Sequence, residues 1–159
     1  MKTPQCPPRF TSPRTERGVA TIEFAICAPV LLLLLLATAE VGRLLFQYNT
    51  LTKTVRDGVR YAATNASVGT TRVVNITAQV RTETRNLVVT GNTAGTGSSV
   101  LPGLTVTNIT VNDVGNGFVS VAATYTYSPM LGATLPTFRL GAPINMAIPL
   151  TATVVMRAL

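Results

Sequence analysis

The chain has 159 residues, of which 47% are hydrophobic and 12% charged, and its 13 Lys and Arg against 6 Asp and Glu give a net charge of +7. It contains no histidine, which excludes Ser-His-Asp and Cys-His catalysis and imidazole metal sites. Its two cysteines cannot form a disulfide framework. We therefore expect no enzyme activity, no cofactor, no metal and no small-molecule substrate. The low charge with high hydrophobicity favours a membrane-attached or assembly-forming protein.

The first 17 residues form a basic, proline-rich leader. Its four Lys and Arg against one Glu give it a charge of +3. Proline in a helix interior breaks the helix, so no continuous helix is expected here. A nucleic-acid-binding arm is the alternative, but the leader lacks interleaved aromatic residues and a folded binding domain. The prolines are Pro4, Pro7, Pro8 and Pro13.

A transmembrane helix is predicted over residues 19–39. This stretch contains six consecutive leucines, 31–36, and its one charged residue is Glu23. Its 21 residues would span about 31 Å as a helix, which matches the hydrocarbon core of a bilayer. Pro29 is expected to kink this helix, which membrane helices tolerate. Four Lys and Arg precede the span and four follow it within 20 residues. The leader is placed in the cytoplasm because Arg17 lies closest to the helix end.

Glu23 is the unusual residue of this segment, because an ionisable side chain inside a membrane is costly. It lies about one turn inside the apolar run, where headgroup contact would lower that cost. The alternative is a partner: if the chain were cut after Gly18, the new amino group of Val19 would be positive. In a bundle of subunits, that amine could pair with Glu23 of a neighbour. Such buried pairs set register more surely than they add stability.

The stretch 17–24 looks like a prepilin cleavage site of the Flp class. Gly18 would precede the cut, Glu23 would be the fifth mature residue and the aromatic Phe24 the sixth. With the motifs that follow, residues 17–63 resemble the TadE-like family, the minor pseudopilins of tight-adherence (Tad/Flp, type IVb) pilus systems. Those further motifs are Pro29, Glu40-Val41-Gly42-Arg43, Tyr48-Asn49 and Arg56-Asp57-Gly58-Val59-Arg60-Tyr61-Ala62-Ala63.

The resemblance implies a single-pass protein of the bacterial inner membrane that is matured by an aspartic prepilin peptidase. It also implies a structural role in pilus assembly, with other pilins, pseudopilins and Tad assembly proteins as partners and a pilin-like architecture. The leader would be 1–18, the span 19–39 and the periplasmic domain 40–159. No nucleic acid is expected among the partners.

The helix is expected to continue beyond the membrane to residue 63, because apolar residues recur there every three or four positions. Its C-terminal half is predicted to pack on its own domain, and a subunit contact over part of the stripe is the alternative. Glu40 and Arg43 stand at i and i+3 and could form a surface pair. A second helix is predicted over 71–87. The stripe consists of Val41, Leu44, Leu45, Tyr48, Leu51, Val55, Val59 and Ala62.

An antiparallel sheet is predicted for the C-terminal part. Apolar residues alternate with Thr, Asn and Ser over 104–111 and 118–127, and Gly115-Asn116-Gly117 supplies a turn between them. A third strand is predicted over 144–156, weakened by Pro149. With the helices, this gives an α+β fold whose sheet packs one face on a helix.

A rival interpretation makes the apolar run a signal peptide. Ala37-Thr38-Ala39 has the A-x-A form of a signal peptidase site and directly follows the leucine run. Cleavage there would release an exported soluble domain starting at Glu40, acting as a binding module. A 39-residue leader exceeds the usual length of ~15–30, and Glu23 would serve no purpose in it. The prepilin interpretation is therefore preferred.

Overall fold

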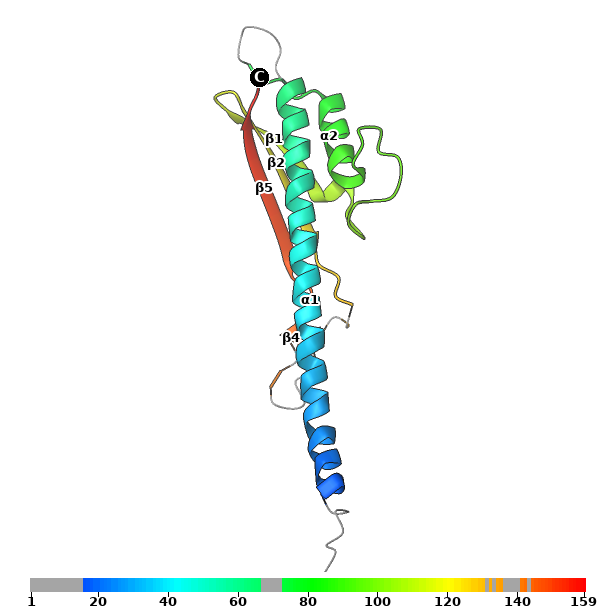
Figure 1. The fold of residues 1–159 in the computed structure, drawn as a ribbon. Helices are drawn as coiled ribbons and strands as arrows, with labels where there is room; N and C mark the ends of the chain where they lie inside the picture. The colour runs from blue at the N-terminus through cyan, green and yellow to red at the C-terminus, as the bar shows by residue number, and fades with distance from the viewer. Residues whose placement is uncertain (1–15, 67–72, 131, 133, 136–140, 143) are drawn as a thin grey trace, which may run out of the picture. The chain divides into compact units, whose positions relative to one another are not determined.

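A computed structural model describes residues 16–66, 73–130, 132, 134–135, 141–142 and 144–159. The predicted leader therefore lies largely outside the described residues. The chain divides into two compact units, Met1–Ala39 and Glu40–Leu159. The elements in chain order are α1 (Glu16–Asn65), α2 (Ala78–Thr90), the 3-10 turn η2 (Val106–Asn108), β1 (Ile109–Gly115), β2 (Phe118–Thr126), β3 (Thr134–Leu135), β4 (Ile144–Asn145) and β5 (Pro149–Arg157) (Figure 1).

The long helix α1 has 50 residues and includes both the predicted membrane span and the predicted stalk. It begins at Glu16, three residues before the predicted start at Val19. No proline lies between Pro13 and Pro29, so nothing in the sequence prevents the end of the predicted leader from joining the helix.

The core of the second unit forms between the C-terminal half of α1, helix α2 and one face of the sheet. Leu51, Val55, Val59 and Ala62 of α1 are fully buried in this core, which confirms the prediction that this half of the stripe packs on its own domain. Of the stripe residues nearer the predicted membrane span, Leu44 is partly buried against the core, whereas Val41 is 52% exposed and Leu45 is 53% exposed.

Helix α2 begins at Ala78, so the prediction of a helix from residue 71 is wrong at its N-terminal end. Residues 71 and 72 lie outside the described residues, and residues 73–77 are not helical. Val73, Val74 and Ile76 are β-branched, which disfavours helix. Thr77 then caps the helix: its side chain accepts a hydrogen bond from the Val80 amide at 3.2 Å. A left-handed Gly91 ends the helix.

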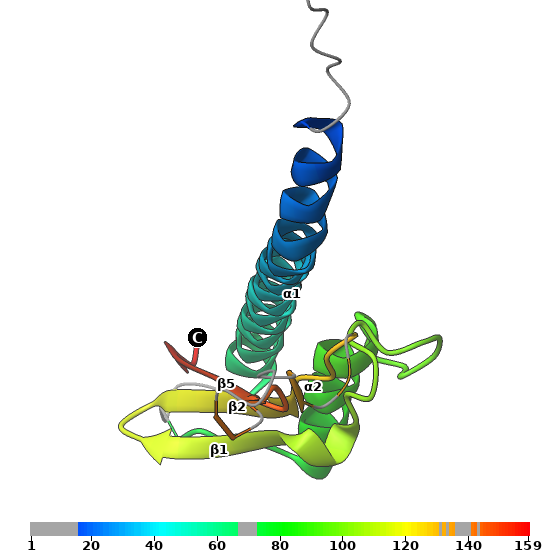
Figure 2. The same ribbon diagram turned by 90° about the horizontal axis from the view of Figure 1, so that it is seen from below.

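The main sheet has the order β1-β2-β5, and both pairings are antiparallel (Figure 2). Gly115, Asn116 and Gly117 all have positive φ and make the predicted turn. The predicted strand 104–111 instead contains η2 and becomes a strand only at Ile109. Pro149 begins β5 rather than interrupting it, because a first strand position needs no backbone donor. The α+β fold is thus confirmed.

The segment between β2 and β5 contains a second, short antiparallel pair, β3 with β4. The strand β3 was not expected from the sequence. The predicted third strand, 144–156, is divided in the structure into β4 and β5, which residues 146–148 separate. Along β2 the burial alternates, so one face of the sheet lies in the core and the other faces outward. That outer face carries threonine, serine and asparagine together with the exposed apolar side chains of Phe118 and Val155.

Candidate functional site

The predicted cleavage site lies in the first turns of α1. Gly18 and Val19 are both exposed, and no atom lies within 4 Å of the position that a Cβ on Gly18 would occupy. The peptide bond between them is therefore sterically accessible, although it is helical in this structure.

Glu23 and Phe24 follow on the same helix, and both are exposed, Phe24 at 70%. Within the described part of the chain, no group pairs with the Glu23 carboxylate. A carboxylate among exposed apolar side chains can be satisfied by water, by headgroups or by a cation from another molecule. The geometry thus leaves Glu23 available for a partner.

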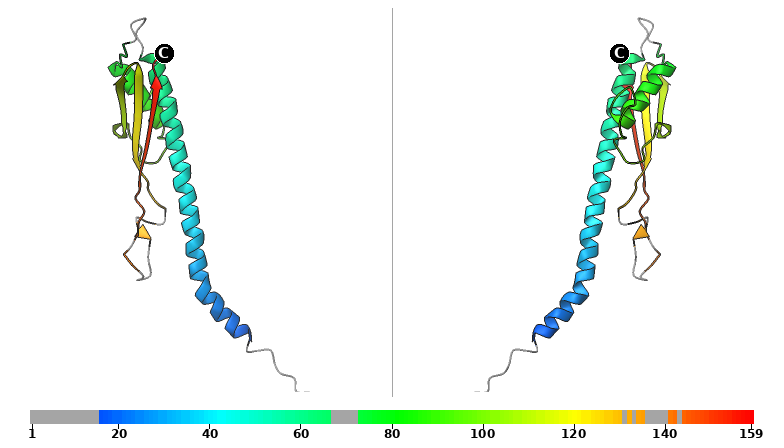
Figure 3. Two further views of the ribbon diagram at one scale, coloured as in Figure 1. Left: turned by 90° about the vertical axis from the view of Figure 1, so that its left-hand side faces the viewer. Right: turned by 90° about the vertical axis from the view of Figure 1, so that its right-hand side faces the viewer.

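Pro29 is the proline inside α1, and Figure 3 shows the N-terminal part of the helix bending. An interior proline removes one backbone hydrogen bond and clashes with the preceding turn, which accounts for a bend. Beside it lies an open apolar groove of about 270 Å³. The groove is lined by Phe24, Ala28, Leu31, Leu32 and Leu35.

By length and composition, the helix over Gly18–Asn65 could cross a membrane, and none of its most apolar window is buried within the protein. The large apolar side chains exposed on this helix include Ile22, Leu31 and Leu34. Such a surface is stable in a lipid bilayer or against other apolar helices, but not in water.

Glu40, the first residue of the second unit, is a buried anchor. Its side chain is only 4% exposed. Its Oε1 accepts a hydrogen bond from the Tyr127 hydroxyl at 2.5 Å and one from the Met130 amide at 3.1 Å. A buried carboxylate is tolerated when it is hydrogen-bonded in this way. The bonds tie α1 to the segment that leaves β2, about 90 residues away in sequence.

The predicted surface pair of Glu40 with Arg43 is wrong, because Glu40 turns inward to Tyr127 and forms no ion pair with Arg43 in the described structure. Arg43 is half-buried nearby. Burial, the hydrogen bond to Glu40 and the Glu40 charge raise the pKa of Tyr127 to about 12, and the charge of Arg43 acts in the opposite direction. The Tyr127 hydroxyl therefore stays protonated, and remains a donor, at all physiological pH values.

Gly42 lies on the exposed surface of α1, and no atom stands within 4 Å of where its Cβ would be. Gly58 differs: a Cβ there would collide with the Val88 side chain of α2. Gly58 thus allows α1 and α2 to approach closely within the domain. No contact within the described residues requires a glycine at position 42.

Tyr61 continues this helix contact. Its hydroxyl donates a 2.6 Å hydrogen bond to Glu83 Oε2, and the Gln79 amide donates to Glu83 Oε1 at 2.9 Å. The bond to Glu83 raises the pKa of Tyr61, and the same bond lowers the pKa of Glu83. The sequence motif contained Gly58 and Tyr61, but their role in positioning α2 could not be predicted from it, because the residue that Tyr61 contacts, Glu83, lies 22 positions further along the chain.

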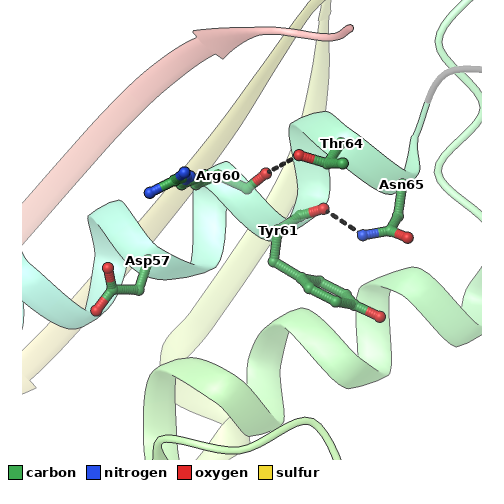
Figure 4. A pocket seen from close by; sticks show the side chains of 5 residues that line it. All are labelled: Asp57, Arg60, Tyr61, Thr64 and Asn65. Atoms are coloured by element: carbon green, nitrogen blue, oxygen red, sulfur yellow. Dashed lines mark hydrogen bonds between the residues drawn. The ribbon is translucent and has the colours of Figure 1, made fainter.

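A shallow pocket of about 280 Å³ lies along the last turns of α1 (Figure 4). It is lined by Asp57, Arg60, Tyr61, Thr64 and Asn65. The Thr64 hydroxyl and the Asn65 amide donate to the carbonyl groups of Arg60 and Tyr61 in the preceding turn. The charged groups of Asp57 and Arg60 have no such bonds among the described residues.

Comparison with known proteins identifies one family. The family model described as TadE-like protein matches residues 18–60, which confirms the resemblance found in the sequence. The match covers the predicted cleavage-site residues, the apolar segment and most of α1, and it ends before α2 and the sheet. No curated protein and no solved structure matches the chain.

Proposed function

We propose that this Tad pilus-associated protein is a minor pseudopilin that takes part in assembling a Flp-type (type IVb) pilus. The observation that carries the proposal is the exposed apolar segment of α1 with its single unpaired carboxylate, Glu23, inside the stretch that matches the TadE-like family. This is a structural role in which α1 packs with other pilin helices.

In this account a prepilin peptidase cuts between Gly18 and Val19. The leader lies in the cytoplasm and the unit from Glu40 onward lies in the periplasm. The new amino group of Val19 on one subunit pairs with Glu23 of its neighbour, which fixes the register of the two helices. Phe24 and the groove beside Pro29 belong to the apolar surface that neighbouring helices cover.

The test replaces Glu23 in the native host. Glu23→Ala and Glu23→Gln should both insert into the membrane at normal levels, because each removes a charge from an apolar segment. Both should reduce the number of pili seen by electron microscopy. Glu23→Asp, which keeps the charge, is the matched control and should retain most pili. Normal pilus number and length in the Ala and Gln variants would refute the register role.

A second candidate is an exported binding module released by signal peptidase after Ala39. The observation in its favour is that the boundary between the compact units falls between Ala39 and Glu40. However, α1 runs without interruption through this boundary. The N-terminal residue of the mature protein distinguishes the two candidates: Val19 for the pseudopilin and Glu40 for the module.

A further inference from the structure

A groove runs along one face of the domain part of α1. Its lower part, towards the N-terminus of α1, has a volume of about 520 Å³. Its upper part, towards the C-terminus of α1, is the pocket of Figure 4 and has a volume of about 280 Å³. The two parts share Asp57, and all their α1 residues recur at spacings of three and four, which places them on one helix face. The lower part is lined by Phe46, Asn49, Thr50, Lys53, Thr54, Asp57 and Val100.

The groove has an apolar end and a charged end. Phe46, which is 70% exposed, and the half-exposed Val100 form the lower end. From Phe46 to Asn65 the helix rises about 29 Å, enough for roughly five turns of a partner helix. Exposed apolar side chains beside charged groups are typical of a protein contact surface.

Most polar groups that line the groove are already bonded within the chain. Thr50 and Thr64 donate to carbonyl groups one turn earlier, and Tyr61 donates to Glu83. Lys53 and Arg60, by contrast, are exposed and form no ion pair within the described structure, and the same is true of Asp57. These three are the charged groups of the groove that are left to select a partner; among the uncharged ones, the exposed Asn49 amide is also unbonded within the described residues.

The order of the charges along the groove determines the charge pattern that a complementary partner helix must carry. Reading along α1, the groove presents a base at Lys53, an acid at Asp57 and a base at Arg60. A parallel helix of complementary charge carries an acid, a base and an acid at i, i+4 and i+7, with an apolar residue two turns before the first acid, opposite Phe46. Like charges placed opposite each other oppose association.

A second copy of this chain does not fit. Two copies inserted in one membrane have parallel helices, and in register each charge of the groove meets its own kind. Shifting one copy by four residues brings Lys53 opposite Asp57 of the other copy, but Arg60 then faces the uncharged Thr64. Shifting one copy by three residues instead brings Asp57 opposite Arg60, but Lys53 then faces Arg56. Each of these two offsets therefore satisfies one pair at most.

We propose that this groove docks a helix of a different pilus-assembly subunit, one that carries the acid-base-acid pattern. This inference rests on the proposed function, because it takes the partner from the same assembly and assumes that both helices insert in the same direction. In this proposal, the charges at Lys53, Asp57 and Arg60 determine which subunit binds and in which register the two helices pair outside the membrane.

The experiment places a photo-crosslinking amino acid at Asn49, an exposed groove residue, in the full chain in its native membranes. Ultraviolet light should give an adduct with one other polypeptide, and mass spectrometry should map the crosslink to a helix with the predicted pattern. The double variant Lys53→Glu/Arg60→Glu should lower the adduct yield at least about tenfold, because it opposes like charges. Arg157→Glu, a charge reversal at an exposed position on β5, is the matched control and should leave the yield unchanged.

An adduct with a second copy, an adduct with lipid alone, or no adduct would overturn the inference, as would a yield that the double variant leaves unchanged. Counting pili in the same strains separates this inference from the proposed function. If deletion of the chain abolishes pili but no heteromeric adduct forms, the docking inference alone fails. If the mapped adduct forms but deletion leaves pili intact, docking stands and the pilus role fails.

Discussion

Replacing Tyr127 with Phe tests the buried anchor at the start of the second unit. The Tyr127 side chain is 1% exposed, and its hydroxyl donates to the Glu40 carboxylate at 2.5 Å. A hydrogen bond to a charged group contributes roughly 1.5–3 kcal/mol. Tyr127→Phe removes this donor and leaves the buried Glu40 carboxylate with the Met130 amide as its hydrogen-bond donor among the described residues. We therefore expect the free energy of unfolding to fall by about 2 kcal/mol.

For a unit of this size, 2 kcal/mol corresponds to a fall in melting temperature of roughly 6–10 °C. Thermal unfolding of the detergent-solubilised full chain, followed by near-ultraviolet circular dichroism, measures it. Tyr48→Phe is the matched control, because Tyr48 is an exposed tyrosine on the same helix and should shift the melting temperature little. If the two variants melt within about 2 °C of each other, the Glu40–Tyr127 bond does not stabilise the domain as argued.

The same bond predicts a dependence on alkaline pH. The pKa of Tyr127 is raised to about 12 from its ordinary value of 10.0, first by burial and then by Glu40, while Arg43 opposes the shift. Since the folded protein holds this proton more tightly, the stabilisation is complete below pH ~10 and is lost as pH rises towards 12. Burial also raises the pKa of Tyr125, so some loss remains in Tyr127→Phe. Between pH ~10 and 12, the free energy of unfolding should nevertheless fall less steeply with pH in Tyr127→Phe than in the wild type.

Three further substitutions test local packing, each by thermal unfolding of the full chain. Gly58→Ala should cost roughly 1–3 kcal/mol, because the added methyl group collides with Val88; an unchanged melting temperature would mean that α2 sits farther from α1. Gly42→Ala should stabilise the helix by roughly 0.5–1 kcal/mol, because nothing lies near its Cβ position, and destabilisation would reveal a close contact within the chain. Thr77→Ala should cost about 1 kcal/mol by removing the cap on the Val80 amide, whereas Thr77→Ser should not; equal losses would show that the cap contributes little.

Local pattern was sufficient for the parts of the fold that depend on near neighbours. The turn at Gly115-Asn116-Gly117 follows from residues that accept positive φ, and the buried stripe from Leu51 to Ala62 follows from helical periodicity. The start of α2 was missed because the apolar residues Val73 and Ile76 fit a helical spacing, while β-branching and the cap at Thr77 favour a later start.

The anchor at Glu40 lay beyond sequence reasoning for a different reason. Its visible neighbour was Arg43, one turn away, whereas its partner Tyr127 is 87 positions further along the chain. Such a contact appears only when the sheet is folded against α1. The predicted processing and assembly residues Gly18, Val19, Glu23 and Phe24 differ from this anchor, because their pattern is visible in the sequence itself. No described group pairs with the Glu23 carboxylate.

The most direct test of the pseudopilin account is the N-terminal sequence of the protein purified from its native host's membranes. The account predicts a mature chain that begins at Val19, with the whole apolar segment and Glu23 retained. A mature chain that begins at Glu40 would contradict it, because the helix that anchors and assembles the subunit would then have been discarded.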